Sequence, residues 1–306
     1  KIKTLKSANL EKNPLLETTL TVKGWVRTIR KQKKFSFVEV NDGSTLSNLQ
    51  VILDASLPNY EQLSEELTTG CSVSITGLLK ESPAKGQAVE LQAKEVTIIG
   101  SCPADDYPLQ KKRHSFEFLR SIAHLRPRTN TLGAITRVRN ALAFATHKFF
   151  QEKDFLYINT PIITAADCEG AGELFRVTTL KGEKFAKDTL GEEDFFKKPT
   201  YLTVSGQLNA ETYACGLSDV YTFGPTFRAE NSNTSRHLAE FWMIEPEMAF
   251  ADLKDDMDCA ESYLKYLISH LLENLQEDMK LFDSFIEKGI IEKLSAITKT
   301  DFERIS

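Results

Sequence analysis

The feature that most constrains the fold of this chain is a change in the period of its apolar residues near residue 100. Segments within residues 20–100, among them LTVKGWVRTIR, FSFVEV and SVSITGLLK, alternate apolar and polar residues and are rich in Val, Ile, Phe and Thr. This pattern is typical of half-buried strands. From residue 132 the apolar residues recur at every third or fourth position, which predicts amphipathic helices. Because one core rarely serves 306 residues, we expect two domains with different secondary structure.

The alternating region predicts a small barrel. It contains five strand-like segments, a turn at Asn41–Ser44 between the second and third, and one helix, about Tyr60–Leu67, between the third and fourth. This is the layout of the OB-fold, a barrel that binds oligonucleotides, and another small barrel or a sandwich is the alternative. The net charge of the chain is −5, yet residues 27–34 (RTIRKQKK) hold five basic side chains. That run is the first place to look for RNA binding.

The second half predicts an α+β domain with a mainly antiparallel sheet. Residues 103–130 carry Pro103, Pro108 and Pro127 and predict a linker. A buried strand is expected at FLYINTPIIT, with Pro161 inside it or at its edge, and further strands at 200–205, 219–230 and 240–250. Two helices are expected, with apolar faces formed by Leu132, Ile135, Val138, Leu142, Ala145 and Phe149, and by Leu253, Met257, Ala260, Leu264, Leu267, Leu271 and Leu275.

Composition excludes several classes of protein. The longest apolar runs are far too short to cross a membrane, and no secretory segment opens the chain. The five cysteines are scattered, with no C-x-x-C pair, which argues for a reducing compartment and against a zinc site or a disulfide scaffold. We therefore expect a cytoplasmic protein with no membrane partner, and we identify no metal site in the sequence.

The richest chemistry lies in residues 225–247, PTFRAENSNTSRHLAEFWMIEPE, which predict a strand–loop–strand hairpin. Arg228 and Glu230 are two residues apart, so on a strand they would face the same side. An Arg fixed on a rigid strand suits a phosphate, because its guanidinium matches two oxygens and keeps its proton. A solvated hairpin with a surface ion pair is the alternative.

This stretch resembles motif 2 of the class II aminoacyl-tRNA synthetases, in the version shared by asparaginyl and aspartyl enzymes. The resemblance implies that Arg228 is the catalytic residue and holds the α-phosphate of ATP. It further implies ATP contacts from Glu230 and from the loop residues, with an aromatic ring stacked on adenine. The implied loop and ring residues are Arg236, His237, Leu238 and Phe241.

Three more stretches of the second half resemble the family. KDFLYINTPIIT resembles motif 1, which implies that Pro161 lies at a homodimer interface. DCEGAGELF resembles the loop that closes over the amino acid, with Glu169 on the substrate ammonium. VSGQLNAE resembles the aspartyl segment Q-L-Y-K, whose Lys pairs with the substrate carboxylate.

In VSGQLNAE, Ala210 takes the place of that Lys and Glu211 follows it, so Gln207 and Glu211 belong to the implied amino-acid site. A carboxylate accepts hydrogen bonds from an amide and repels a second carboxylate. The segment therefore predicts asparagine over aspartate as the substrate. A surface helix with an exposed Glu211 is the alternative.

The first half resembles the anticodon-binding OB domain of the class IIb group, through GWVRTIRKQKKFSFVEVNDGS. The resemblance implies that Phe37 stacks on the central anticodon base, that Gln50 reads the edge of that uridine, and that Arg30 contacts a base or a phosphate. For Phe37, a place in the barrel core is an equal alternative.

Together these matches, from about Val22 to Ser306, resemble the asparaginyl-tRNA synthetases. They imply a multidomain β and α+β protein: an OB-fold anticodon-binding domain at 1–102, a linker at 103–130, and a class II catalytic domain at 131–306. No G-x-G-x-G-x-E-R of motif 3 occurs, so we expect an incomplete catalytic domain, a weak or inactive fragment, and Mg²⁺ ligands in a C-terminal part outside it.

The implied function is ATP-dependent ligation of asparagine to tRNA(Asn) through an asparaginyl-adenylate, with ATP and Mg²⁺ as cofactors and a homodimer as the assembly. Three alternatives remain. They are a non-discriminating aspartyl-tRNA synthetase, an asparagine synthetase derived from the family, and a non-catalytic tRNA-binding fragment.

Overall fold

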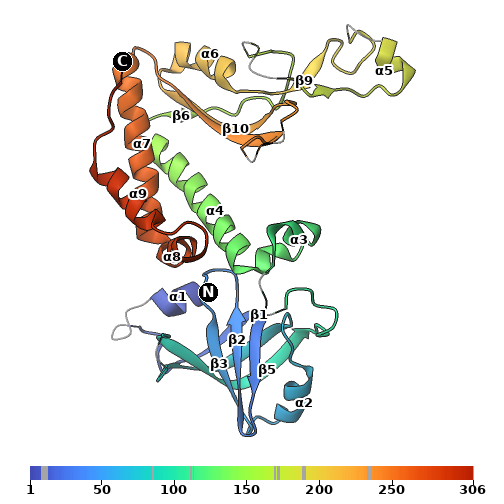
Figure 1. Cartoon of the computed structure of the whole chain (residues 1–306), viewed down its shortest axis with the longest axis vertical. Helices are drawn as coiled ribbons and strands as arrows, with labels where there is room; N and C mark the ends of the chain where they lie inside the picture. Colours follow the sequence, from blue (N-terminus) through green and yellow to red (C-terminus); the bar gives the residue numbers. More distant parts are fainter. Residues whose placement is uncertain are drawn as a thin grey trace. The chain divides into compact units, whose positions relative to one another are not determined.

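The structure is a computed structural model that describes residues 1–7, 13–84, 86–110, 112, 114–168, 170, 173–187, 191–232, 234 and 236–305. The chain divides into two compact units, Lys1–Asn140 with Leu271–Ser295, and Ala141–His270 with Ala296–Ser306. Helices α4 (Asn130–Gln151) and α7 (Leu253–Asn274) therefore each begin in one unit and end in the other (Figure 1). The domain boundaries expected at residues 102 and 130 stay a prediction.

The first unit contains the predicted barrel. Its strands close in the order β1-β2-β3-β5-β4, with β3 and β5 parallel and the other neighbours antiparallel. The one helix between the third and fourth strands is α2 (Tyr60–Glu66), as predicted. The OB-fold layout is thereby confirmed and a sandwich is excluded. The strands are β1 (Thr19–Lys31), β2 (Phe35–Asn41), β3 (Leu49–Asp54), β4 (Ser72–Glu81) and β5 (Val89–Gly100).

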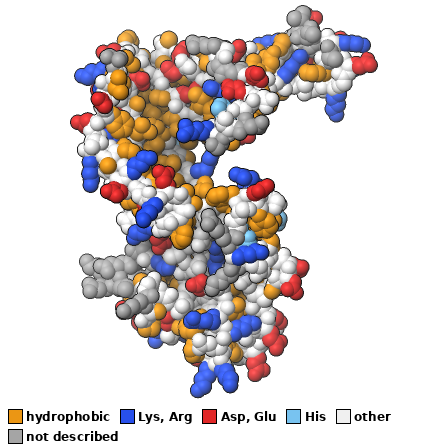
Figure 2. Space-filling view, viewed as in Figure 1, with side chains coloured by type: hydrophobic (Ala, Val, Ile, Leu, Met, Phe, Trp, Pro, Cys, Tyr) orange, Lys and Arg blue, Asp and Glu red, His pale blue; other side chains and the backbone are white. Residues whose placement is uncertain are grey.

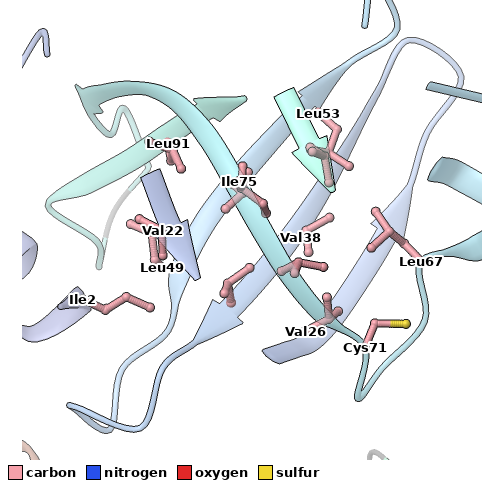
Figure 3. Packing of buried hydrophobic residues seen from close by; sticks show 14 of the residues in the cluster. Ile2, Val22, Val26, Val38, Leu49, Leu53, Leu67, Cys71, Ile75 and Leu91 are labelled. Atoms are coloured by element: carbon pink, nitrogen blue, oxygen red, sulfur yellow. The ribbon is translucent and has the colours of Figure 1, made fainter. Parts of the chain in front are cut away.

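Strand alternation fills the barrel. Every strand sends apolar side chains inward, and Ile2 of α1 (Ile2–Ser7) joins them (Figure 3). Full burial of such a side chain stabilises the fold by about 1.5–3 kcal/mol. The residues between them on each strand point outward, where a ligand can reach them. The inward set includes Val22, Val38, Leu49, Ile75 and Leu91, one from each strand.

Helices of the first unit hold the loop between β2 and β3. On α8 (Gln276–Phe285), Glu277 accepts hydrogen bonds from Thr45 Oγ1 at 2.6 Å and Ser47 Oγ at 2.8 Å. Its neighbour Asp278 forms an ion pair with Arg137 of α4, at 2.6 Å between Nη2 and Oδ1. These contacts attach α8 to the loop between β2 and β3, although Glu277 lies 230 positions after Ser47 in the sequence. The remaining helices that begin in this unit are α3 (Phe116–Ser121), the 3-10 helix η2 (Arg126–Arg128) and α9 (Ile290–Lys299).

The second unit is built on an antiparallel hairpin of β10 (Val220–Phe227) and β11 (Glu240–Glu247). The short β6 (Leu156–Tyr157) pairs with β10 in parallel. A second sheet, antiparallel, has the order β7-β9-β8, and the prediction of a mainly antiparallel unit is confirmed. Further elements of the second unit are β7 (Ile163–Thr164), β8 (Arg176–Val177), α5 (Glu183–Lys187), β9 (Thr200–Leu202) and α6 (Gln207–Leu217).

The two faces of the β10–β11 sheet differ in chemistry. On one face, Tyr221, Phe223 and Ile244 pack with aromatic residues of α4 and α7, which makes the core of this unit. Paired residues of an antiparallel sheet share a face, so the register of pairing identifies the residues on the opposite face. That face carries Thr222, Thr226, Phe241, Glu245 and Glu247.

The prediction of one buried strand at FLYINTPIIT is wrong. Only β6 and β7 form there, two residues each, and they belong to different sheets. Pro161 lies between them and is exposed. Proline has no N–H to donate to a sheet, and the short strands on its two sides pair with different partners, β6 with β10 and β7 with β9.

The predicted apolar face of α7 is wrong in part, although the helix itself is confirmed and Leu271 of the predicted set is buried. Leu253 and Leu264 are exposed, and the side that packs on the sheet carries Cys259, Tyr263 and Tyr266. Large aromatic rings bury more area against other rings than leucines do, so they decide which side packs. Over the described part of the chain, no helix combines the length and the apolar character that a membrane crossing needs.

Candidate functional site

Arg228 comes directly after β10, and its backbone N–H donates to Ala239 O at 3.1 Å. The guanidinium lies with Cζ 5.4 Å from the ring centre of Phe241, and Nη2 donates to Val204 O at 3.4 Å. Its Nε is buried and has no hydrogen-bond partner among the described residues, and none of them forms an ion pair with it. The side chain is therefore positioned by the fold, while its charge has no ion-pair partner and one of its donors is unsatisfied among the described residues.

The hairpin loop differs from the expectation in one respect. Because β10 ends at Phe227, Arg228 and Glu230 do not share a strand, and Glu230 is exposed. Glu230 Oε2 lies 3.9 Å from His237 Nε2, and Thr234 forms a hydrogen bond with His237 Nδ1. Arg236 and Leu238 are exposed. The structure thus brings Arg228 and Phe241 together and leaves the other predicted ATP contacts on the exposed loop.

Sequence reasoning missed Glu245, the most heavily hydrogen-bonded carboxylate on this face. It accepts from Thr222 Oγ1 at 2.9 Å, from Gly206 N at 3.0 Å, and from the Ser205 hydroxyl. A Cβ at Gly206 would lie 2.9 Å from Thr160 Oγ1 and 3.2 Å from Glu245 Oε2, so the position favours glycine. The two-residue period of β11, counted from Phe241, could have identified Glu245.

A cavity of about 130 Å³ opens beside Glu245, lined in part by Tyr157, Thr160, Thr226 and Trp242. Its lining combines aromatic rings with hydroxyl groups and one carboxylate. Such a mixture is common in small-molecule sites, where a few polar groups fix the orientation of the ligand.

Carboxylates gather where α6 meets the sheet. Gln207 Nε2 donates to Glu211 Oε1 at 3.1 Å, and Glu211 is half-buried, which disfavours the surface-helix alternative. Burial, followed by the charges of Glu211, Glu245 and Asp256, raises the pKa of Glu247 to about 7. A region that resists a further negative charge suits a ligand that donates hydrogen bonds and disfavours a carboxylate.

Some predicted residues are only partly placed. Glu169 lies outside the described residues, and the neighbouring Gly170 has φ +66°. Pro161 is exposed. Within the described ranges, no group of three or more His, Cys, Asp or Glu is arranged to hold a metal ion. All five cysteines are free.

On the barrel, Arg30, Phe37 and Gln50 lie outside the core. Arg30 pairs with Phe37 across β1 and β2, with Cζ 4.8 Å from the ring centre. Phe37 is half-buried and is absent from the core cluster, so the alternative of a core position is wrong. Gln50 Nε2 donates to Glu90 Oε2 at 3.4 Å. In the basic run, Arg27 bonds to Asn130 at 2.8 Å, while Arg30, Lys31, Lys33 and Lys34 are exposed.

Comparison with known proteins adds the family. Residues 116–306 match the family of class II tRNA synthetases (D, K and N), and residues 20–99 match the OB-fold nucleic acid binding domain. The asparagine–tRNA ligase of Protochlamydia amoebophila is 63% identical over 310 residues, covering 100% of this chain and 66% of that protein. The asparagine–tRNA ligase of Microcystis aeruginosa is 60% identical over 290 residues, covering 95% and 63%. The chain thus spans a little less than two thirds of these relatives.

Solved structures of asparaginyl-tRNA synthetases superpose on most of this chain. Asparaginyl-tRNA synthetase from Pyrococcus horikoshii, complexed with asparaginyl-adenylate, superposes with a TM-score of 0.77 at 26% identity, over 92% of this chain and 60% of that one. The Entamoeba histolytica asparaginyl-tRNA synthetase complex with asparaginyl-adenylate gives 0.74 at 25%, over 92% and 60%. These matches confirm the predicted order of a closed OB barrel followed by a class II catalytic domain. Since the catalytic family matches well over half of its residues, this chain belongs to the class II tRNA synthetases of the D, K and N group.

Proposed function

We propose that this chain is part of an enzyme that activates asparagine with ATP and ligates it to tRNA(Asn). The observation that carries the proposal is Arg228, a guanidinium placed beside an aromatic ring with a buried, unpartnered Nε. A buried donor without a partner is unfavourable, so its presence points to a ligand that supplies the acceptor. The asparagine–tRNA ligases to which the chain is similar support asparagine as the substrate.

In the first step, an oxygen of the asparagine carboxylate attacks the α-phosphorus of ATP. A bond forms between them, the bond to the β-phosphate oxygen breaks, and pyrophosphate leaves. Arg228 donates to the α-phosphate oxygens as charge develops on them, and Phe241 stacks on adenine. Arg236, His237 and Leu238, with Glu230, cover the nucleotide from the loop. Such a step needs positioning and charge stabilisation more than covalent participation by the protein.

The amino acid is selected by residues of α6 and of the loop that contains Glu169. Glu211, held by Gln207 at 3.1 Å, accepts the side-chain amide hydrogens of asparagine and repels an aspartate carboxylate. Glu169 holds the substrate ammonium. A site built to hydrogen-bond a substrate group rejects an analogue that lacks it, without a separate editing step.

In the second step, a hydroxyl of the terminal tRNA ribose attacks the activated carbonyl carbon. An ester forms and AMP leaves. The barrel adds affinity away from the reacting atoms: Phe37 stacks on the central anticodon base, Gln50 reads the edge of that base, and Arg30 contacts a base or phosphate. One stacked base contributes about 1–3 kcal/mol.

Cofactor, assembly and location are part of the same proposal. ATP is the energy source and Mg²⁺ is expected of the family. Among the described residues, no group of three or more His, Cys, Asp or Glu is arranged to hold that ion. A homodimer with Pro161 at its interface is supported by the exposure of that residue and by its resemblance to motif 1. The free cysteines support a cytoplasmic location.

The test is amino-acid-dependent pyrophosphate exchange on the native enzyme, followed by charging of tRNA(Asn). Exchange with asparagine well above that with aspartate is expected. Comparable exchange with both amino acids would favour a non-discriminating aspartyl enzyme, and amidation of aspartate would favour an asparagine synthetase. Binding of tRNA with no exchange would leave a non-catalytic RNA-binding role.

A further inference from the structure

The segment between α5 and β9 carries an exposed run, Phe195-Phe196-Lys197-Lys198, here called the FFKK turn. Phe195 is 71% exposed and Phe196 43%, and their ring centres lie 4.8 Å apart in an edge-to-face contact. Both lysines are exposed as well. Exposed apolar side chains that adjoin one another and are rimmed by polar ones are a feature of interaction sites.

The FFKK turn is held by a buried carboxylate. Asp194 accepts hydrogen bonds from Thr179 N at 2.9 Å, Thr179 Oγ1 at 3.0 Å and Phe195 N at 2.8 Å. The backbone closes the turn, since Lys197 N donates to Asp194 O at 3.1 Å. Hydrogen bonds from Thr178 and Thr179 keep the pKa of Asp194 well below its ordinary value, so the carboxylate holds the turn at physiological pH. The two rings are therefore displayed on a formed backbone, which lowers the entropy lost when a ligand binds.

The chain leads from this turn directly to the candidate site. After Lys198 it enters β9 and reaches Thr203 and Val204, whose carbonyls accept from Phe227 N at 2.8 Å and from Arg228 Nη2 at 3.4 Å. In Figure 1 the segment with α5 and β9 extends away from the β10–β11 hairpin. Figure 2 shows Lys and Arg side chains next to hydrophobic ones on the outer part of this segment. The turn thus precedes, along the chain, the residues that contact Arg228 and Phe227.

We propose that the FFKK turn is a stacking platform for the unpaired acceptor end of the tRNA, an inference that rests on the proposed function. Aromatic faces stack on any base, and neighbouring lysines neutralise backbone phosphates, which is the chemistry of single-strand recognition. The exposed Glu192 and Glu193 precede the turn and repel phosphates, so they confine the strand to the lysine side. An apolar protein surface would match the rings but not the paired lysines, whereas a single strand offers bases and phosphates together.

The experiment compares tRNA binding by three variants of the native enzyme. The test variant is the double change Phe195→Ala with Phe196→Ala, and Phe195→Tyr with Phe196→Tyr keeps the stacking faces. Phe285→Ala is the matched control, because Phe285 is 74% exposed on α8 and has no part in the proposal. Each variant is titrated with intact tRNA(Asn) and with tRNA(Asn) trimmed of its unpaired 3′ nucleotides, and pyrophosphate exchange is measured in parallel.

The alanine variant should bind intact tRNA at least about fivefold more weakly, the effect of one lost stack. It should bind trimmed tRNA as well as the unchanged protein does, with exchange within twofold. The tyrosine variant and Phe285→Ala should match the unchanged protein. An equal loss for both tRNAs, no loss for either, or a changed oligomeric state without tRNA would each overturn the proposal. Normal tRNA binding without any exchange would instead overturn the proposed activity, so the two failures are distinguishable.

Discussion

Replacing Arg228 with methionine separates the effect of this side chain on folding from its effect on catalysis. Nε is buried with no partner, and Nη2 has only long contacts, 3.4 Å to Val204 O and 3.9 Å to Met243 Sδ. An unsatisfied buried donor costs about 1–3 kcal/mol. Methionine has a similar reach and fills irregular space well. Since Arg228 is only half-buried, we expect Arg228→Met to raise the free energy of unfolding by about 1 kcal/mol, the low end of that range.

The same substitution should sharply reduce activation. Removing one preorganised donor to a transition-state oxygen lowers the rate by about 100-fold or more, equivalent to about 2.7 kcal/mol. The control is Arg137→Met, which leaves Asp278 without its partner although the Asp278 side chain is only 5% exposed. Breaking a buried pair from one side costs about 3–5 kcal/mol. The two Arg-to-Met changes should thus shift the free energy of unfolding in opposite directions.

Urea unfolding measures the first effect, and asparagine-dependent pyrophosphate exchange on the native enzyme measures the second. If Arg228→Met lowers the free energy of unfolding by more than about 1 kcal/mol, the guanidinium has a structural role that the contacts do not reveal. If exchange stays within threefold of the unchanged enzyme, Arg228 does not hold the α-phosphate. Either result refutes the reasoning.

Three further outcomes are expected. Phe37→Ala should raise KM for tRNA and leave pyrophosphate exchange unchanged, because stacking is remote from the reacting atoms; a parallel fall in exchange would contradict this. Glu211→Gln should lower kcat/KM for asparagine and make aspartate a less poor substrate, since a charge-assisted bond becomes neutral; an unchanged ratio would show that Glu211 faces away. The pKa of Glu247 is raised from 4.5 to about 7, so the folded state binds its proton more tightly and stability from this group falls as pH rises between those values. Glu247→Gln should flatten that part of the Tm profile, and an equally steep fall would exclude Glu247 as its cause.

The barrel was predictable because its alternation is regular, but the orientation of β2 was not. In FSFVEVN, the odd and the even positions each hold two apolar residues, so the period of two alone does not choose the inward set. The structure puts Ser36, Val38 and Val40 inside. The odd set includes Glu39, whose burial would be far more costly than that of a serine, and this difference decides the orientation and leaves Phe37 outside.

In the catalytic unit, the hairpin and its Arg228 could be found from residue order alone, because both belong to one continuous stretch. The two-residue period of β11 places Glu245 on the same face as Phe241, but residue order alone does not reveal its partners, which come from β10 and from the residues before α6. The break at Pro161 and the packed side of α7 depend on contacts with other elements. The sequence pattern of α7 alone does not show that Tyr263 and Tyr266 pack against Phe149 of α4.

The hydrogen bonds that Glu277 accepts from Thr45 and Ser47 have a consequence for the synthesis of the protein. The barrel strands emerge early in synthesis, yet the partner of their β2–β3 loop lies 230 residues later. At about 5–20 residues per second, the ribosome needs roughly 10–50 s to reach it. During that interval we expect the nascent barrel to keep the β2–β3 loop open to proteases, and the loop to become protected only after α8 has emerged. Limited proteolysis of ribosome-stalled chains of two lengths, ending before and well after α8, would show this order, and equal protection at both lengths would contradict it.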